Sequence, residues 1–159
     1  CTIEEEDTLG TLHDKLKKIG AKGLEKAINL IESGKVIAEK QDESLVTFVK
    51  PISKEQEVID WSDTKENIYN KIRGLNPFPG ALSYYDDQII KVYLSEKIDK
   101  EYDGEYGEIV EILNKKGPVV KVKNGGIILK EVKFQGKKSQ SGIDIINGRK
   151  IILNSKFGK

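Results

Sequence analysis

The sequence predicts an α+β protein that is mainly β: a small OB-like antiparallel β-barrel with flanking helices. Five or six short strand patterns, separated by turn signals, follow one another within about 55 residues after Pro79. An Asn124-Gly125 pair between two of these patterns is a strong hairpin signal. A helical pattern over residues 9–31 precedes the strands and is separate from them.

The N-terminal stretch predicts a long amphipathic helix. Acidic residues at 4–7 suit the positive end of a helix dipole, and Asp7 or Thr8 can cap the helix. Gly34 ends the pattern. This apolar stripe must be buried against a partner, and none is evident in the rest of the chain. Its residues are Leu9, Leu12, Leu16, Ile19, Leu24, Ala27, Ile28 and Ile31.

A segment without helical periodicity follows, from Lys35 to Val58. Leu45–Val49 is typical of a short extended piece that Pro51 ends, and the remainder is interpreted as linker. Trp61, the only tryptophan, comes next. We interpret it as a buried anchor rather than as a platform for ligand stacking.

A second helix is predicted over residues 63–73. Asp63 and Glu66 match the capping-box pattern that opens a helix, and Gly74 ends the apolar periodicity.

The stretch after this helix predicts a rigid junction. Pro77 and Pro79 forbid continuation of the helix, and each favours an extended residue before it. Gly80 then permits a turn into the strands.

The strand region runs from Ala81 to Phe134, and a short helix at Ser141–Asn147 follows it, stopped by Gly148. The predicted strands are Ala81–Tyr85, Ile89–Leu94, Glu105–Leu113, Val119–Lys123 and Gly126–Phe134.

Positive charge is concentrated in the C-terminal part of a chain whose net charge is only +1. Residues 115–159 contain 12 of the 27 Lys and Arg and 2 of the 26 Asp and Glu, a net charge of +10. The remaining 15 basic and 24 acidic residues give residues 1–114 a net charge of −9. Such asymmetry predicts a surface for nucleic acid or another polyanion, with a solvated lysine face as the alternative.

Residues suited to catalysis are few. His13 is the only histidine, which excludes a histidine cluster, and no Ser-His-Asp set is evident around it. We therefore predict no catalytic residue and no metal ligand in this chain. The single cysteine, Cys1, excludes an internal disulfide and favours a cytoplasmic location. No apolar run approaches the roughly 18–20 residues that span a membrane, and the absence of methionine suggests a fragment of a longer protein.

Four stretches together carry a resemblance to a known family: "GTLHDKL", "QDESLVTFVKPISKEQEVIDW", "KIRGLNPFPGA" and "FQGKKSQSGIDIINGRK". They resemble the C-terminal portion of the methionyl-tRNA formyltransferases. In that family the catalytic Asn, His and Asp and the formyl-folate pocket lie in a Rossmann-like N-terminal domain, which would precede residue 1. Phe78 stands where the family more commonly has tryptophan, and we expect it to serve as an aromatic anchor.

The resemblance implies three parts: residues 1–34 as the last helix of the truncated N-terminal domain, 35–61 as linker, and 62–159 as the OB-like barrel domain. The parent enzyme would transfer a formyl group from 10-formyltetrahydrofolate to the amino group of initiator methionyl-tRNA. This fragment would be inactive alone, bind no formyl-folate and hold the tRNA, with the N-terminal catalytic domain as its partner and no membrane. The tRNA-binding candidates are Lys50, Lys54, Arg73, Lys121, Lys123, Lys130, Lys133, Lys137 and Lys138.

Other readings stay open at this point. Arg73 equally suits a structural role that holds the helix to the junction. A related sugar-nucleotide formyltransferase or formyl-folate hydrolase shares the two-domain plan, but needs no tail of net charge +10. A stand-alone OB-type RNA-binding module leaves the amphipathic helix of residues 9–31 unexplained.

Overall fold

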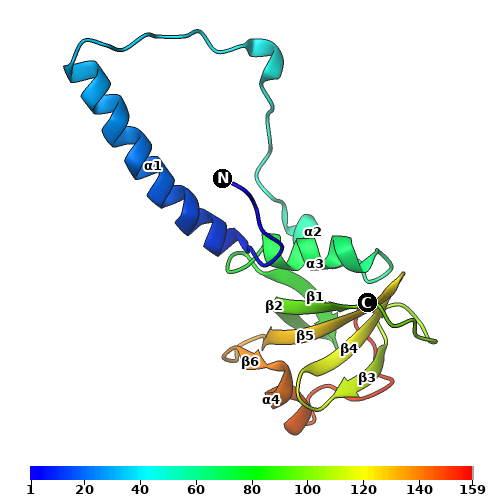
Figure 1. Ribbon diagram of the computed structural model, residues 1–159. Coiled ribbons are helices and arrows are strands. Elements are labelled where there is room, and N and C mark those ends of the chain that lie inside the picture. The colour runs from blue at the N-terminus through cyan, green and yellow to red at the C-terminus, as the bar shows by residue number, and fades with distance from the viewer. Residues whose placement is uncertain (159) are drawn as a thin grey trace.

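The framework of the protein is a six-stranded antiparallel sheet flanked by helices, in a computed structural model that describes residues 1–158 (Figure 1). The predicted α+β class, mainly β, is confirmed. The strands are β1 (Ala81–Tyr85), β2 (Gln88–Ile98), β3 (Ile109–Leu113), β4 (Gly117–Val122), β5 (Gly125–Phe134) and β6 (Gln140–Ser141). The helices are α1 (Leu9–Glu32), α2 (Lys54–Glu57), α3 (Lys65–Gly74) and α4 (Gly142–Asn147), with a 3-10 turn at Glu43–Leu45.

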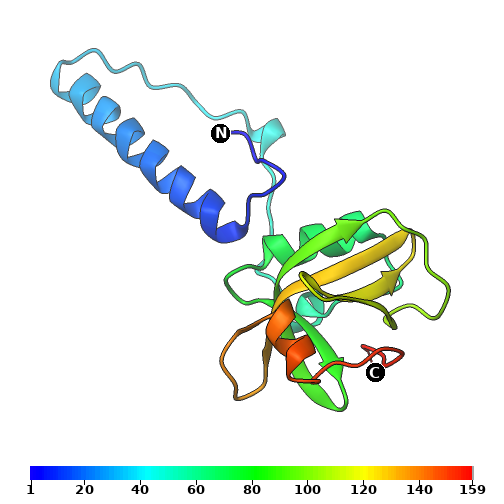
Figure 2. The ribbon, with the colours of Figure 1, turned by 60° about the horizontal axis from the view of Figure 1, so that its bottom comes forward.

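The strand order is β1-β2-β5-β4-β3, with β6 paired to β5. Two-residue turns join β1 to β2 and β4 to β5. Asp86 and Asp87 have φ values of 49° and 58°, the left-handed region that such turns need. In the second turn Lys123 and Asn124 lie between the last paired residues of the two strands. α4 packs on β4 and β5 beside these hairpins (Figure 2).

The structure does not show the closed barrel that the sequence analysis predicts. β1 and β3 are the two edges of the sheet, and no ladder joins them within residues 1–158. The C-terminal segment lies between them instead: Phe157 makes a single bridge to Tyr85 of β1, and Lys156 makes one to Glu108 just before β3. Isolated bridges from an irregular segment do not continue a hydrogen-bonded ladder, so the two edges stay unjoined.

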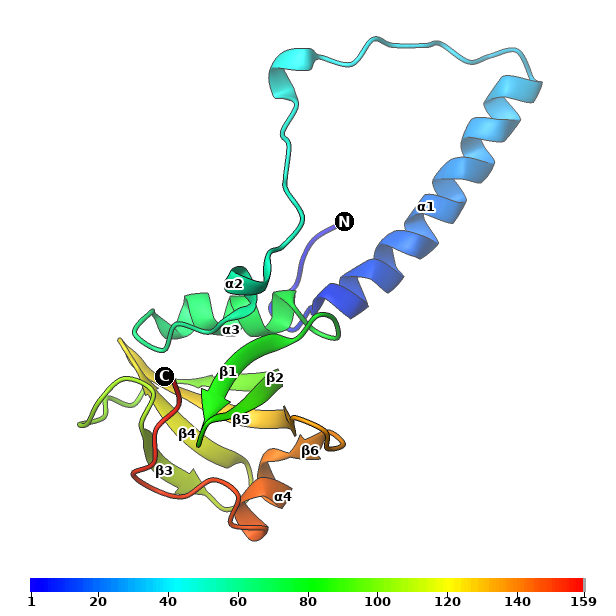
Figure 3. The ribbon, with the colours of Figure 1, turned by 180° about the vertical axis from the view of Figure 1, so that it is seen from behind.

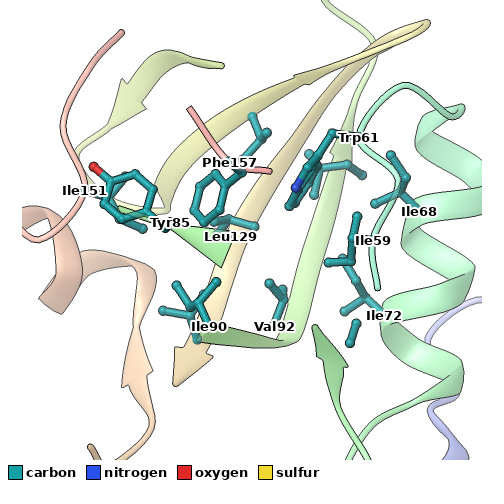
Figure 4. Close-up of a cluster of buried hydrophobic side chains, with 14 of the residues drawn as sticks. Ile59, Trp61, Ile68, Ile72, Tyr85, Ile90, Val92, Leu129, Ile151 and Phe157 are labelled. Carbon is teal, nitrogen blue, oxygen red and sulfur yellow. The ribbon is translucent and has the colours of Figure 1, made fainter. Parts of the chain in front are cut away.

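The hydrophobic core lies between the sheet, α3 and the segment that precedes α3 (Figure 4). Trp61 is 4% exposed, and its ring centroid lies 5.4 Å from that of Phe157. Its indole Nε1 donates a 2.9 Å hydrogen bond to Ser83 Oγ, which gives the buried indole N–H a partner. Ile68 and Ile72 of α3 are buried in the same cluster. The prediction that Trp61 is a buried anchor is confirmed.

The start of α3 differs from the predicted capping box. Thr64 is the N-cap, because its hydroxyl accepts a hydrogen bond from the backbone N–H of Asn67. Asp63 accepts from the Asn67 side chain, and Glu66 accepts from the side chain of Asn124 across the domain. The long-range contact of Glu66 competes with the local one, so the predicted pairing of Asp63 and Glu66 is wrong.

Several strand ends also differ from the predicted ones. β2 continues to Ile98 because β5 pairs with it along its whole second half. β3 begins only at Ile109, because the residues before it form a turn in which the backbone N–H of Glu108 donates to Glu105 O.

The junction after α3 folds back on the sheet as a tight loop. The Asn76 side chain donates a 2.8 Å hydrogen bond to Tyr93 O, and the N–H of Gly80 donates to Leu75 O at 2.8 Å. Gly80 has φ of 85°, as the predicted turn requires, and a Cβ there would lie 2.9 Å from the Tyr93 ring. Phe78 is 76% exposed, so the expectation of an aromatic anchor is wrong: its ring lies on the surface.

α1 projects from the sheet, and residues 35–53 return from its far end to α2 (Figures 1 and 2). Thr8 is its cap, with Thr11 completing a capping box. No residue of α1 is buried. Of Leu45–Val49, predicted as a short extended piece, Leu45 ends a 3-10 turn and the other four residues belong to no strand; Phe48 is 94% exposed. The apolar stripe of α1 is therefore without a packing partner in the described residues.

The first turns of α1 are attached to the rest of the molecule. The backbone N–H of Gly10 donates a 3.0 Å hydrogen bond to Asn76 O, which sets the helix beside the junction loop (Figure 3). Asp7, 6% exposed, accepts a 2.6 Å hydrogen bond from Lys15 Nζ and a 2.8 Å bond from the N–H of Glu4. These contacts lower the pKa of Asp7 to about 2. The division into parts at residues 34 and 61 stays a prediction.

We expect the amides of α1 to exchange through local opening with a free energy of about 0, because the apolar stripe of this helix is not buried. The amides of β5 should exchange only with an opening free energy that approaches the free energy of global unfolding. Hydrogen exchange on a dilute monomer measures both. Self-association at higher concentration should protect α1, because pairing covers the stripe. Protection of α1 in the dilute monomer equal to that of residues 107–134 would contradict the expectation.

Candidate nucleic-acid interface

Arg73 makes internal contacts rather than standing free for a ligand. Its Nη1 donates to the carbonyl oxygens of Glu4 and Asp7, both at 3.0 Å, and its Nε donates to Asn70 Oδ1 at 2.8 Å. The guanidinium also lies 5.8 Å from the centre of the Tyr69 ring. Arg73 thus ties the segment before α1 to α3, a structural role, but with a partner other than the junction that the sequence analysis suggested.

Lys121 and Lys130 are also engaged. Lys121 Nζ donates to Tyr102 O and lies 5.8 Å from the Tyr106 ring centroid. Lys130 Nζ is 3.5 Å from an oxygen of Glu96, whose other oxygen accepts from Lys116. The Lys116 hydrogen bond, followed by the charges of both lysines, lowers the pKa of Glu96. Part of the predicted basic surface is therefore already neutralised within the protein.

Lys123 does not share a strand face with Lys121. β4 ends at Val122, so the alternation that predicts a common face stops one residue too early. Lys123 stands exposed in the β4–β5 turn, where its backbone N–H donates to Asp63 O at 3.2 Å.

The other five candidates are exposed at positions that constrain them little. Lys50 lies in the segment before α2, and Lys54 is the first residue of α2. Lys133 is the outward residue next to the end of β5. Lys137 and Lys138 lie in the turn that follows β5.

Two lysines that the sequence analysis missed lie beside these candidates, although each also makes a hydrogen bond within the protein. Lys91 lies directly opposite Lys133 in the β2–β5 ladder. Lys150, just after α4, borders a hollow of 250 Å³ together with Lys137. Only strand alternation could have flagged Lys91, between the core residues Ile90 and Val92. The opposition of Lys91 and Lys133 depends on a register between distant strands, so no local pattern reveals it.

This arrangement of lysines suits an anionic ligand. Ammonium groups on strands and turns suit phosphate oxygens, which supply most of the affinity in nucleic-acid complexes. His13, the only histidine, is exposed and lies 3.6 Å from Asp14. No group of three His, Cys, Asp or Glu suited to a metal ion occurs among residues 1–158. In that same range, no helix combines the length and the apolar character needed to cross a membrane.

Comparison of this chain with known proteins gives a family and a fold. The family described as formyl transferase, C-terminal domain, matches residues 51–150. The crystal structure of HypX from Aquifex aeolicus in complex with tetrahydrofolic acid has a similar fold, with a TM-score of 0.65 and 14% sequence identity. That similarity covers 84% of this chain and 23% of the HypX chain.

The sequence relatives are more similar. The methionyl-tRNA formyltransferase of Fusobacterium nucleatum is 48% identical over 156 residues, covering 98% of this chain and 50% of that protein. The methionyl-tRNA formyltransferase of Bacillus subtilis is 41% identical over 157 residues, covering 98% of this chain and 49% of that protein. The chain thus spans about half the length of the curated relatives it matches. The chain belongs to the family of formyl transferase C-terminal domains, and the resemblance to methionyl-tRNA formyltransferases is confirmed.

Proposed function

We propose that this chain is the tRNA-binding half of a methionyl-tRNA formyltransferase. The parent enzyme transfers the formyl group of 10-formyltetrahydrofolate to the amino group of initiator methionyl-tRNA in the cytoplasm. The observation that carries the proposal is 48% identity to such an enzyme over 98% of this chain. The basic C-terminal part supports it, because the partner is a polyanion.

The chemistry belongs to the preceding half of the parent enzyme in this proposal. There the methionyl amine attacks the formyl carbon, assisted by the Asn, His and Asp that the family resemblance assigns to the N-terminal domain, where formyl-folate also binds. The present chain positions the tRNA: exposed lysines hold phosphates, and the attachment of α1 through Arg73 fixes the direction in which the preceding half leaves the sheet.

A double substitution tests the tRNA contact. Lys137→Ala with Lys138→Ala should weaken tRNA binding and flatten the slope of log K against log salt by about one to two units, because two phosphate contacts are lost. Titrations of the 159-residue chain with tRNA at several salt concentrations measure both quantities. Substitution of Lys50 and Lys54 should have a smaller effect in this chain than in the intact enzyme.

The matched control is Lys17→Ala with Lys18→Ala, an adjacent pair of exposed lysines on α1. This control should leave the salt slope as it is in the wild type. If the Lys137 and Lys138 variant keeps both affinity and slope, these two lysines are only a solvated face and make no tRNA contact.

A further inference from the structure

A groove of 670 Å³ runs over the outer face of β1 and β2 and reaches the end of β5. Its outer-face side chains alternate with the core residues of the same strands, so they point away from the core. Register places Leu82 of β1 against Lys91 of β2, and Lys91 against Lys133 of β5. The junction loop and the end of α2 complete its lining.

The lining is unusually rich in apolar and aromatic side chains for a sheet face outside the core. Such a face is ordinarily polar, because water solvates it. Here Leu82, Tyr84, Ile89 and Tyr93 line it from the strands, and the Phe78 ring stands at its border, 76% exposed. Phe78 serves no packing role in the domain that would explain its position, so its ring is available to a flat ligand.

The same groove is positively charged. Lys54, Lys91 and Lys133 line it, and Glu57 is the single carboxylate among its lining residues. Lys91 Nζ donates to Pro79 O and lies 4.0 Å from Glu57 Oε2, so one lysine is largely satisfied internally. The side chain of Lys133 is exposed. The groove therefore suits a ligand that carries both negative charge and flat apolar groups.

We propose that this groove binds the unpaired nucleotides at the acceptor end of the tRNA, with a base stacked on Phe78 and phosphates held by Lys54 and Lys133. Aromatic rings beside lysines are the combination by which proteins bind single-stranded nucleic acid. The inference rests on the proposed function and adds to it a site distinct from the Lys137–Lys138 turn. A protein segment as occupant would leave the excess of lysines over acids without a role.

The position of the groove agrees with this occupant. The Gly10 N–H to Asn76 O bond sets the first turn of α1 beside the loop that carries Phe78 (Figure 3). In the proposed parent enzyme, α1 leads back to the half that performs the chemistry. An acceptor end lying in the groove would therefore pass close to the junction of the two halves, where the reacting amine has to arrive.

The test compares intact tRNA with tRNA from which the unpaired 3′ nucleotides have been removed. Phe78→Ala in the 159-residue chain should weaken the binding of intact tRNA by about fivefold to 150-fold, the range for loss of one base–aromatic stack. The same substitution should leave the binding of the shortened tRNA unchanged. Phe78→Tyr should retain most of the affinity, since it keeps the ring. Phe48→Ala removes a 94% exposed ring outside the groove and serves as the matched control.

A fluorescent base analogue at an unpaired 3′ position gives a second readout. Its fluorescence should be quenched on binding to the wild type and much less on binding to Phe78→Ala. If Phe78→Ala weakens the binding of intact and shortened tRNA equally, the inference is overturned. Unchanged affinity for both would also overturn it, leaving the groove to a protein contact while tRNA binding stands. If the wild-type chain binds neither RNA, the proposed function fails, and the inference with it.

Discussion

Replacing Trp61 with alanine is expected to lower the free energy of unfolding by about 3–5 kcal/mol, the usual cost of deleting a large buried aromatic side chain. Trp61 is 4% exposed and packs against Phe157, whose ring in turn lies 5.0 Å from that of Tyr85. The substitution opens a cavity at the point where the segment before α3, the sheet and the C-terminal segment meet. It also leaves Ser83 Oγ, in a side chain only 1% exposed, without its donor.

Urea unfolding followed by far-UV circular dichroism measures this loss, since the variant has no tryptophan to report by fluorescence. Trp61→Phe should cost less, because it keeps most of the ring while losing the hydrogen bond to Ser83. Phe48→Ala is the matched control and should change stability by no more than about 0.5 kcal/mol, because that ring is 94% exposed. A Trp61→Ala variant as stable as the control would refute the view that this side chain joins the three segments.

The second large effect concerns activity. We expect the 159-residue chain, incubated with 10-formyltetrahydrofolate and methionyl-tRNA, to form no formyl-methionyl-tRNA above the uncatalysed background. The physical reason is that a formyl transfer needs a positioned proton acceptor and a bound donor. The one histidine of the chain is exposed beside Asp14 on α1.

Acid gel electrophoresis, which separates formyl-methionyl-tRNA from methionyl-tRNA, measures this reaction. An intact methionyl-tRNA formyltransferase at the same concentration provides the positive control. Turnover by a sample of this chain that is free of contaminating enzyme would contradict the expectation that the chain is inactive alone. It would also contradict the assignment of the chemistry to the preceding half of the parent enzyme. Tight tRNA binding without turnover is the combined result that the proposal requires.

Much of the secondary structure follows from local signals in the sequence. The two aspartates at 86 and 87 set the first hairpin, because the left-handed backbone of its turn is decided by a few adjacent residues. The ends of elements are less local. Glu66 is drawn to Asn124 rather than to Asp63, and β2 runs on to Ile98 because a distant strand pairs with it.

The candidate site shows the same division. The concentration of lysine in residues 115–159 is a property of composition, so the sequence by itself establishes it. Which of those lysines remain available is decided by neighbours far along the chain: Tyr102 engages Lys121, and Glu96 engages Lys130. Lys91 enters the group only through its register with Lys133.

The sequence alone determines the α+β class, the turn at Gly80, the burial of Trp61 and the family, because each depends on residue type or on neighbours a few positions away. The tertiary structure alone decides that the sheet edges stay unjoined, that Arg73 clamps the start of α1, and that Phe78 faces solvent beside a lysine-lined groove. Those outcomes depend on how segments some 20 to 70 residues apart come together, and hydrophobic burial and hydrogen-bond geometry select that arrangement over the whole fold at once.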